Sequence, residues 1–495
     1  MKATTLGELK ESGWKSVSVK EEIRRNLIKK IRSKEELFPG ILGYDKTVLP
    51  QIQHALLSKH DMILLGLRGQ AKTRILRMLV NFMDEYIPIV KGSEINDDPL
   101  NPLSKYAKDL VAEKGDDTPV EWLHRSYRYG EKLATPDTTV ADLIGDIDPI
   151  KAATNKLTLA DQNVINFGLI PRTNRGLFVI NELPDLQPRI QVALLNIMQE
   201  RDIQIRGFNV RIPLDVSMAF SANPEDYTNR GNIITPLKDR IDSQIITHYP
   251  KELGIGVNIT RQEAWQKRES GVDVYIPELF REIVEQAAFE ARDSEYVDQK
   301  SGVSTRMTIT AMEQLVSSAE RRAIVNEEDE TSVRIADLYH MIPALTGKIE
   351  LVYEGEQEGA MNVAKHILGK AISKTFKQYF PDPQSKAEDQ KEKYKEVMDW
   401  FADGNEINIS DTLSNKEYEK GLSKVAGLKG IVQKYAKEAP KKEYFVWMDF
   451  VLDALHQNSM LSKQDLDDET LYSDMLGSMF SSLGDLDDDG FNDFE

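Results

Sequence analysis

The stretch MILLGLRGQAKTRIL occupies residues 62–76 and has the pattern of a buried strand, a glycine-containing loop and a helix. Its spacing, Gly66-x-x-Gly69-x-x-Lys72-Thr73, matches a phosphate-binding P-loop in all but one position. In such a loop, small residues let backbone N–H groups turn toward phosphates at the N-terminus of a helix. We therefore expect a nucleotide at this loop and an α/β fold around it.

The loop residues have distinct expected roles. Lys72 would reach the β- and γ-phosphates of ATP, and the Thr73 hydroxyl would hold Mg²⁺. Ala71 stands where the motif normally has glycine, and alanine resists a positive φ angle. We expect a working site with a slightly altered loop. The alternative is an ordinary strand–turn–helix that carries a surface lysine.

Composition narrows the class of protein. The length of 495 residues suggests two to four domains. The absence of cysteine excludes disulfides and thiolate metal sites and favours a reducing compartment, so we expect a cytoplasmic protein. No run approaches the ~18 apolar residues of a membrane span, and the N-terminus lacks a secretory h-region. The net charge of −18 argues against a nucleic-acid partner, although a local basic channel would still be compatible with it.

Hydrophobic patterning predicts strands at 62–66, 86–90, 176–181 and 216–223, an inserted ribbon at 139–150 and a hairpin at 203–214. Helical patterns separate them at 19–34, 45–58, 73–86 and 189–201. This alternation predicts a doubly wound, largely parallel sheet. Beyond residue 255 the patterns are helical, at 277–293, 310–326, 334–345, 358–377 and 393–456, with a linker at 378–392.

Polar residues follow two of the predicted core strands. Asn181 and Glu182 follow the strand 176–181, and Asn223 ends the strand 216–223. Because ligands bind at the carboxyl ends of strands in open α/β sheets, we expect these side chains near the P-loop. Glu182 would orient or deprotonate the attacking water. Asn181 stands where P-loop ATPases usually carry an aspartate for Mg²⁺, which predicts weaker Mg²⁺ binding; a protein that binds nucleotide without hydrolysing it remains an alternative.

At this point the chain resembles the AAA+ ATPases of the MoxR and magnesium-chelatase I-subunit group. The resemblance covers roughly residues 38–325 and is carried by ordered blocks: ILGYDKTV, GLRGQAKTR, LIGDIDPIKA, GLIPRTNRGLFVINEL, LLNIMQERDIQIRG, FSANPED, LKDRID and STRMTITAMEQLVSSAERRA. It implies a P-loop AAA+ module with β-hairpin inserts, followed by an all-α lid and a helical C-terminal region.

The resemblance also implies a set of site residues. Glu182, Asn223 (sensor 1), Arg240 (arginine finger) and Arg306 (sensor 2) would be catalytic, and Thr73 and Asn181 would hold Mg²⁺. The residues implied to bind ATP are Ile41, Gly43, Gly66, Arg68, Gly69, Gln70, Ala71, Lys72, Thr73 and Arg74. Arg230 competes for the finger role, and a surface ion pair of Arg240 with Asp239 or Asp242 is the structural alternative.

Five segments are expected: an N-terminal helical segment (1–37), the nucleotide-binding domain (38–252), a helical lid (253–350), a C-terminal helical region (351–463) and an acidic tail (464–495). The tail has eleven acids and no Lys or Arg, with large apolar residues between the acids. We expect it to fold on a partner or a neighbouring subunit; a solubilising tail is the alternative. Asp485, Asp487, Asp489 and Gly490 also resemble the start of a calcium-binding EF-hand loop.

The resemblance implies an ATP-hydrolysing chaperone that forms a homo-hexameric ring and remodels a partner complex, with a von Willebrand A-type domain protein as partner. The alternatives are the ATPase motor of a magnesium chelatase acting on a porphyrin, and a nucleic-acid motor. Arg206 and Arg211 of the predicted hairpin permit the last of these, and the overall charge argues against it.

Overall fold

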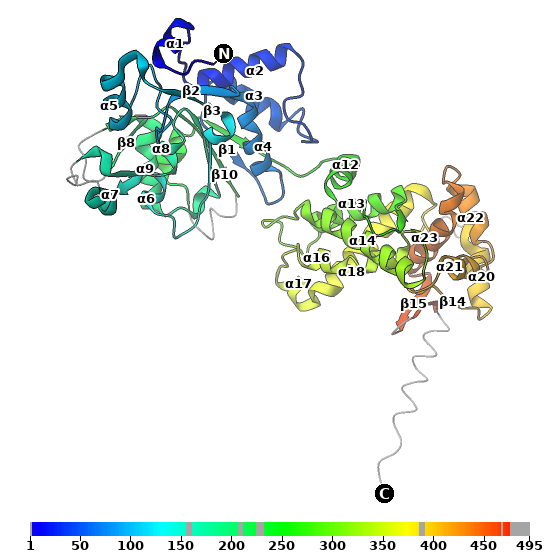
Figure 1. Ribbon diagram of the computed structural model, residues 1–495. Helices are drawn as coiled ribbons and strands as arrows, with labels where there is room; N and C mark the ends of the chain where they lie inside the picture. Colours follow the sequence, from blue (N-terminus) through cyan, green and yellow to red (C-terminus); the bar gives the residue numbers. More distant parts are fainter. Residues whose placement is uncertain are drawn as a thin grey trace. The chain divides into compact units, whose positions relative to one another are not determined.

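The computed structural model describes residues 2–154, 161–205, 211–223, 232–385, 392–466 and 469–475. The chain forms two compact units, residues 1–249 and 250–495 (Figure 1). The finer division into five segments stays a prediction. None of the described helices is both long enough and apolar enough to cross a membrane.

The first unit is built on a five-stranded sheet with the order β11-β1-β10-β7-β4. Each adjacent pair of strands runs parallel, so all five carboxyl ends lie at one edge of the sheet. This sheet, with helices between its strands, confirms the predicted α/β class. Its strands are β1 (Met62–Leu65), β4 (Tyr129–Leu133), β7 (Gly176–Asn181), β10 (Val216–Ala222) and β11 (Ser243–Ile246).

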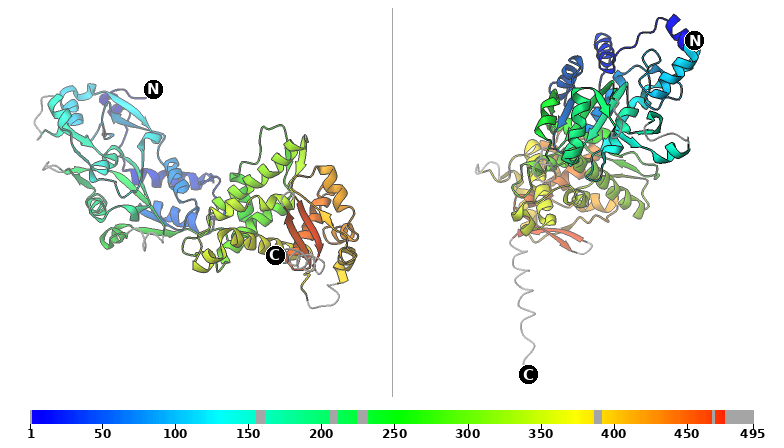
Figure 2. Two further views of the ribbon diagram at one scale, coloured as in Figure 1. Left: turned by 90° about the horizontal axis from the view of Figure 1, so that it is seen from below. Right: turned by 90° about the vertical axis from the view of Figure 1, so that its left-hand side faces the viewer.

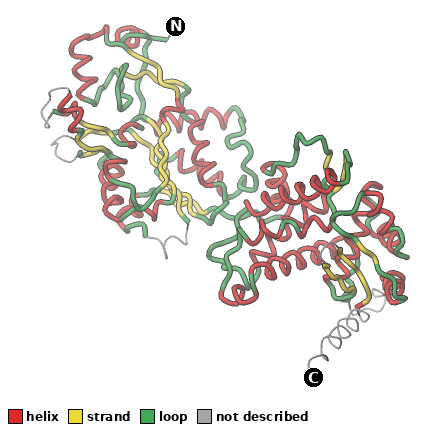
Figure 3. Tube along the Cα trace, turned by 60° about the horizontal axis from the view of Figure 1, so that its bottom comes forward, coloured by secondary structure: helices red, strands yellow, loops and turns green. Residues whose placement is uncertain are grey.

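Alternation along the strands divides the apolar side chains between the two faces of the sheet. Met62 and Leu64 of β1 pack in one core cluster with helices α2 (Val19–Arg32), α3 (Val48–Leu57) and α4 (Lys72–Met78). Ile63 packs on the opposite face with α9 (Pro188–Gln199) and α11 (Thr235–Arg240). Figure 3 shows helices on both sides of the yellow strands. The sheet is therefore doubly wound, as predicted.

Several boundaries differ from the predicted ones. The helix expected to reach residue 86 ends at Met78 and continues as the 3-10 helix η1 (Leu79–Phe82). Strand β2 (Tyr86–Val90) has the predicted bounds but pairs with β3 (Val120–His124), outside the main sheet. Strand β5 (Gly145–Ile147) pairs with β6 (Ile165–Phe167), and β8 (Asp202–Gln204) pairs with β9 (Arg211–Pro213). The remaining helices of this unit are α1 (Leu6–Glu11), α5 (Lys105–Lys114), α6 (Val140–Leu143), α7 (Pro149–Thr154) and α8 (Leu169–Arg172).

The second unit is largely helical, as predicted, and has one extended hydrophobic core. It also contains a small parallel sheet of β12 (Asp273–Tyr275) and β13 (Glu330–Ser332). Its helices are α12 (Leu253–Glu263), α13 (Glu278–Asp293), α14 (Arg306–Val325), α15 (Ile335–Tyr339), α16 (Ile342–Thr346), α17 (Tyr353–Glu358), α18 (Ala360–Tyr379), α20 (Lys395–Ala402), α21 (Asn415–Leu422), α22 (Leu428–Tyr435) and α23 (Tyr444–Gln457).

The start of the acidic tail belongs to this second unit. Strands β15 (Leu461–Leu466) and β16 (Glu469–Asp474) form a hairpin, drawn in orange-red in Figure 2, and β16 also pairs with β14 (Ile407–Asn408). Tyr472 is 1% exposed and donates a hydrogen bond to Asp453 of α23. The expectation that the apolar residues from 464 onward serve a partner is therefore wrong for Tyr472, because it packs on its own chain. Met479, Phe480, Phe491, Phe494 and the calcium-like loop lie outside the described residues.

Candidate nucleotide site

The P-loop backbone connects β1 to α4, and two of its residues adopt the left-handed conformation. Gly69 has φ +74°, and Ala71 has φ +58° and ψ +13° directly before the first residue of α4. A non-glycine residue in this region carries a cost of order 1–3 kcal/mol, which persists only where the surroundings enforce it. The structure thus gives Ala71 the conformation that glycine adopts readily, and the missing glycine leaves the loop strained rather than reshaped.

Side chains from elsewhere in the first unit hold this strained loop. The Tyr44 hydroxyl lies 2.7 Å from the carbonyl oxygen of His248 and 3.1 Å from that of Gln70, and its one proton is shared between these two acceptors. Burial raises the pKa of Tyr44 to about 12, so its hydroxyl keeps the proton it donates. The Tyr249 hydroxyl donates to the carbonyl of Arg68 at 2.9 Å. Two tyrosines, one before the loop in sequence and one after the sheet, therefore tie down its backbone.

Gly66 is required for space at the start of the loop. A Cβ atom there would lie 1.9 Å from Thr247 Oγ1, which itself donates to Gln70 Oε1 at 2.6 Å. Ile41 is 7% exposed, and Gly43 has φ +80° directly before Tyr44. The segment ILGYDKTV, residues 41–48, thus contacts the loop through Tyr44. Contact of Ile41 and Gly43 with nucleotide stays a prediction.

Lys72 lies inside the loop. Its side chain is buried, and its ammonium donates to the carbonyls of Gly66 and, at 2.9 Å, Leu67. Both acceptors are neutral loop carbonyls, so phosphate oxygens would offer the ammonium stronger, charge-assisted hydrogen bonds. Arg74, in the first turn of α4, is exposed. The arrangement contradicts the alternative of a surface lysine.

An oxygen cluster lies beside the loop at the carboxyl ends of β7 and β10. Asn181 Oδ1 accepts a hydrogen bond from Ser221 Oγ at 2.9 Å and lies 3.5 Å from Thr73 Oγ1. Hydroxyl and amide oxygens suit Mg²⁺, which usually keeps several waters and shares its site with substrate phosphates. The described residues contain no group of three His, Asp or Glu side chains that would hold a metal without a nucleotide. The donor set therefore fits Mg²⁺ that arrives with phosphates.

Asn181 is also bonded to a carboxylate on the neighbouring strand. Its Nδ2 donates to Glu131 Oε1 at 2.7 Å. Glu131 in turn accepts two hydrogen bonds from Arg77 of α4, at 2.8 and 3.0 Å, and one from Tyr129 at 3.0 Å. Burial raises the pKa of Glu131, but the hydrogen bonds from Arg77 and Tyr129 outweigh it and the net pKa is lowered. Glu131 is therefore ionised at neutral pH.

Glu182 and Asn223 lie where the ends of two adjacent strands converge. Glu182 has φ +54°, a left-handed conformation that is rare outside glycine, and its backbone N–H donates to Ser221 Oγ at 3.4 Å. Asn223 directly follows Ala222, whose carbonyl accepts the N–H of Gly66 at 3.2 Å. Both predicted residues thus lie at the sheet edge that carries the P-loop, and their catalytic roles stay predictions.

Arg240 lies at the opposite edge of the sheet. It ends α11, and the following residues pair with the start of β1, since Ser243 donates to the carbonyl of Asp61. Its guanidinium donates to Gln199 at 2.6 and 2.9 Å and to the carbonyl of Pro236. Among the described residues, the ion pair with Asp239 or Asp242 that was the structural alternative is not formed. The four residues of β11 span on the order of 13 Å, which separates Arg240 from the P-loop of the same chain.

Arg306 is exposed at the first residue of α14 in the second unit, where its backbone N–H donates to Ser304 Oγ at 3.1 Å. Arg230 and Arg206 lie outside the described residues.

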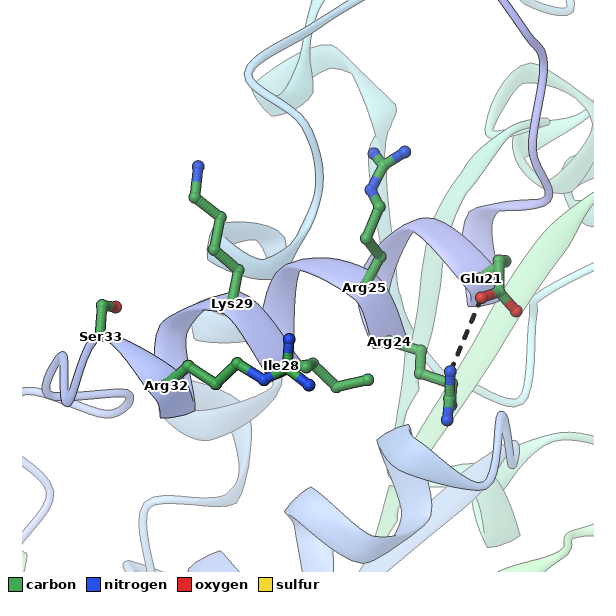
Figure 4. Close-up of a pocket in the computed structure, with 7 residues that line it drawn as sticks. All are labelled: Glu21, Arg24, Arg25, Ile28, Lys29, Arg32 and Ser33. Carbon is green, nitrogen blue, oxygen red and sulfur yellow. Dashed lines mark ion pairs between the residues drawn. The ribbon is translucent and has the colours of Figure 1, made fainter.

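A separate hollow lies along the exposed face of α2 (Figure 4). Arg24 pairs with Glu21 at 3.8 Å, and Arg25 pairs with Asp84 at 2.5 Å. Arg32 and Lys29 complete a basic helix surface. This surface lacks the loop and strand ends of a phosphate site.

Sequence reasoning missed the roles of Glu131, Ser221, Tyr44 and Tyr249. The signal for Ser221 is a hydroxyl near the carboxyl end of the strand VSMAFSA, which is otherwise apolar except for Ser217. Tyr44 lies inside a block that we singled out without a role for the tyrosine. Glu131 had no comparable signal, because its strand, YGEKL, is short and half polar.

No protein-family model and no curated protein matches this chain. Among solved structures it is similar to a candidate ATPase from Cytophaga hutchinsonii, with 18% identity over 73% of this chain and 97% of that one and a TM-score of 0.28. It is similar to a chain in the BchI–BchD complex of magnesium chelatase, with 18% identity over 65% and 98% and a TM-score of 0.33. It is also similar to NtrX from Brucella abortus in complex with ADP, with 13% identity over 75% and 67% and a TM-score of 0.36. All three TM-scores are below 0.5.

Proposed function

We propose that this chain is a Mg²⁺-dependent ATPase of the AAA+ type that acts as an oligomeric ring. The observation that carries the proposal is the Lys72 ammonium, which is buried in a loop closed by Gly69 and Ala71 in left-handed conformations. Thr73 and Asn181 supply oxygens beside it. A buried cation in a loop of this conformation, next to oxygens that suit Mg²⁺, is best explained by a nucleoside triphosphate.

The residues divide the chemistry among them. Bound Mg²⁺ would neutralise charge on the phosphates, and Thr73 and Asn181 would hold it. Lys72 would exchange its carbonyl partners for phosphate oxygens. Glu182 would accept a proton from, or orient, the attacking water, and Asn223 would hydrogen-bond that water or the γ-phosphate.

Arg240 supports a site completed by a neighbouring subunit. It lies at the amino edge of the sheet, whereas the P-loop lies at the carboxyl edge. An arginine that stabilises transition-state charge from this position must therefore reach the nucleotide of another copy, which requires an assembly such as a hexameric ring. Arg306 would contribute as sensor 2 from the second unit.

Mixing two inactive variants tests this assembly. Arg240→Ala subunits keep an intact Glu182, and Glu182→Gln subunits keep an intact Arg240. In a mixed ring, some sites combine both intact residues, so ATPase activity should reappear. Failure of rescue at every mixing ratio, with rings shown by light scattering, would contradict a finger acting between subunits.

We further propose that the ring remodels a partner protein complex, with a von Willebrand A-type domain protein as partner. A magnesium-chelatase motor acting on a porphyrin is the second candidate. Co-purification with the Glu182→Gln variant, which should hold ATP and retain its partner, tests the choice. Recovery of a von Willebrand A-type protein without porphyrin-binding subunits supports the first, and the reverse supports the second.

A nucleic-acid motor is the third candidate, and the basic face of α2 with Arg24, Arg25, Lys29 and Arg32 favours it locally. The net charge of −18 argues against it. Binding of labelled single- and double-stranded DNA that falls steeply with salt and is lost when Lys29 and Arg32 are replaced by alanine would support this candidate.

A further inference from the structure

Four side chains form a continuous line of contacts at the site. Thr73 and Arg77 are four residues apart and therefore lie on one face of α4. Thr73 contacts Asn181, Asn181 donates to Glu131, and Arg77 donates twice to Glu131. Strands β7 and β4 are paired so that Asn181 is opposite Leu133, which brings the Glu131 side chain to the same face as α4. A carboxylate is thus built in behind the amide that replaces the usual aspartate.

We propose that Glu131 supplies the negative charge that Asn181 lacks and strengthens Mg²⁺ binding by acting through the Asn181 amide. This inference rests on the proposed function, since the cation is the one that accompanies ATP. Glu131 is a positioning residue in this role, because its oxygens already accept hydrogen bonds from Asn181, Arg77 and Tyr129.

The effect has two physical parts. The hydrogen bond to Glu131 fixes the orientation of the amide, so that Nδ2 faces the carboxylate and Oδ1 faces Thr73 and Ser221. An amide that donates to a carboxylate is also polarised, which makes its oxygen a better ligand for a cation. Such partners behind a metal ligand typically change metal affinity by 10–100-fold.

Arg77 explains how the charge is tolerated without a cation. Its side chain is 63% exposed, whereas that of Glu131 is 21% exposed. The guanidinium therefore balances the carboxylate from the solvent side and leaves the Asn181 side facing the site. Replacing Arg77 by methionine should keep its apolar stem and release the charge of Glu131 toward the cation, which should tighten Mg²⁺ binding.

The same geometry explains why asparagine is suited to position 181. Aspartate there would place a second carboxylate against Glu131, at a contact that now measures 2.7 Å, and would remove its hydrogen bond. The exchanged pair, Asn181→Asp with Glu131→Gln, keeps one carboxylate and one amide and reverses the donor. It should therefore preserve both the charge and the hydrogen bond.

The experiment measures binding of a fluorescent ATP analogue to the full chain over a range of Mg²⁺ concentrations, with a parallel series in EDTA. Glu131→Gln should raise the half-saturating Mg²⁺ concentration about tenfold and leave binding in EDTA unchanged. The exchanged pair should return it to within about threefold of the original chain. Glu121→Gln is the matched control, since Glu121 lies on β3 and accepts from Gly92, away from the site.

Three outcomes separate the possible failures. If Lys72→Ala leaves binding of the analogue unchanged, the proposed function fails. If Lys72 matters but Glu131→Gln leaves the half-saturating Mg²⁺ concentration unchanged, this inference alone is overturned. If Glu131→Gln lowers the melting temperature so far that it cannot be titrated, the exchanged pair decides: restored Mg²⁺ dependence supports the inference, and a tenfold loss overturns it.

Discussion

Lys463 donates to Asp453 at 2.8 Å, and both side chains are buried in the second unit. This ion pair joins the hairpin strand β15 to helix α23, and Tyr472 of β16 bonds to the same carboxylate. Breaking a buried pair by removing one partner typically costs 3–5 kcal/mol, because it leaves a charge without compensation. The hairpin is therefore part of the fold of the second unit, although its sequence is acidic.

Two truncations test this conclusion. A chain ending at Lys463 loses β16 and the buried Tyr472, so the free energy of unfolding of the second unit should fall by at least about 3 kcal/mol. That corresponds to roughly 6–12 °C in melting temperature by calorimetry. A chain ending at Met475 keeps every described strand and should melt like the full chain. Equal melting temperatures for the two truncations would contradict a structural role for the hairpin.

Replacing Ala71 by glycine should stabilise the P-loop. Ala71 has φ +58°, which glycine adopts without a steric penalty. The free energy of unfolding should therefore rise by about 1 kcal/mol, and the melting temperature by roughly 2–4 °C. Ala112→Gly, in the exposed interior of α5, is the control and should destabilise by a similar amount. Thermal unfolding of both variants measures the difference, and a loss of stability in Ala71→Gly would show that the left-handed turn is wrongly assigned.

Glu182→Gln should separate binding from turnover. The amide keeps the size of the side chain and loses the charge and the proton acceptor, so ATP affinity should stay within about threefold while hydrolysis falls by 10²–10⁴-fold. Single-turnover hydrolysis and filter binding of labelled ATP measure the two quantities. Hydrolysis at the original rate would remove Glu182 from the chemistry.

Asp449 should make the stability of the second unit fall as pH rises. Burial raises its folded pKa from 3.8 to about 7, and the hydrogen bond from Tyr418 opposes this only in part; Asp453 raises it further, whereas Lys463 lowers it. Because the folded pKa lies above the unfolded one, the fold holds a proton that the unfolded chain has released. Stability is therefore greatest below about pH 4, falls up to about pH 7 and then levels off with respect to this group.

Urea unfolding at pH 5 and at pH 7 measures this effect. As pH rises, the free energy of unfolding of the original chain should fall by up to about 1.4 kcal/mol per pH unit relative to that of Asp449→Asn, because the asparagine cannot titrate. Asp403→Asn, at the exposed end of α20, is the control for loss of a carboxylate. The same pH dependence in all three chains would exclude Asp449 as its source.

The inner strands of the sheet could be predicted from sequence, and its edges could not. Strands β1, β7 and β10 have continuous apolar runs because both of their faces are covered. The edge strands β4 and β11, YGEKL and SQII, are partly polar, and their pairing with distant strands has no local signal. Glu131 could not be predicted for the same reason, because its contact with Asn181 depends on which strand pairs with β7.

The candidate site shows a similar division. Lys72 and Thr73 were predictable because loop spacing is local, and Asn181 because it ends a buried strand. Tyr44 and Tyr249 were not, since they reach the loop from sequence-distant segments. The hairpin at 461–474 could not be predicted, because its acidic composition is typical of an unfolded tail. In the structure, Tyr472 of this hairpin faces the core.

In the proposed nucleotide site, Lys72 binds the phosphates of ATP. Calorimetric titration of ATP with Mg²⁺ into the full chain and into Lys72→Ala tests it most directly, with Lys108→Ala on the exposed face of α5 as the control. Loss of charge-assisted hydrogen bonds worth about 1.5–3 kcal/mol each predicts affinity at least ten- to a hundredfold weaker for Lys72→Ala and unchanged for Lys108→Ala. Equal ATP affinity in all three chains, each shown to be folded, would contradict the account.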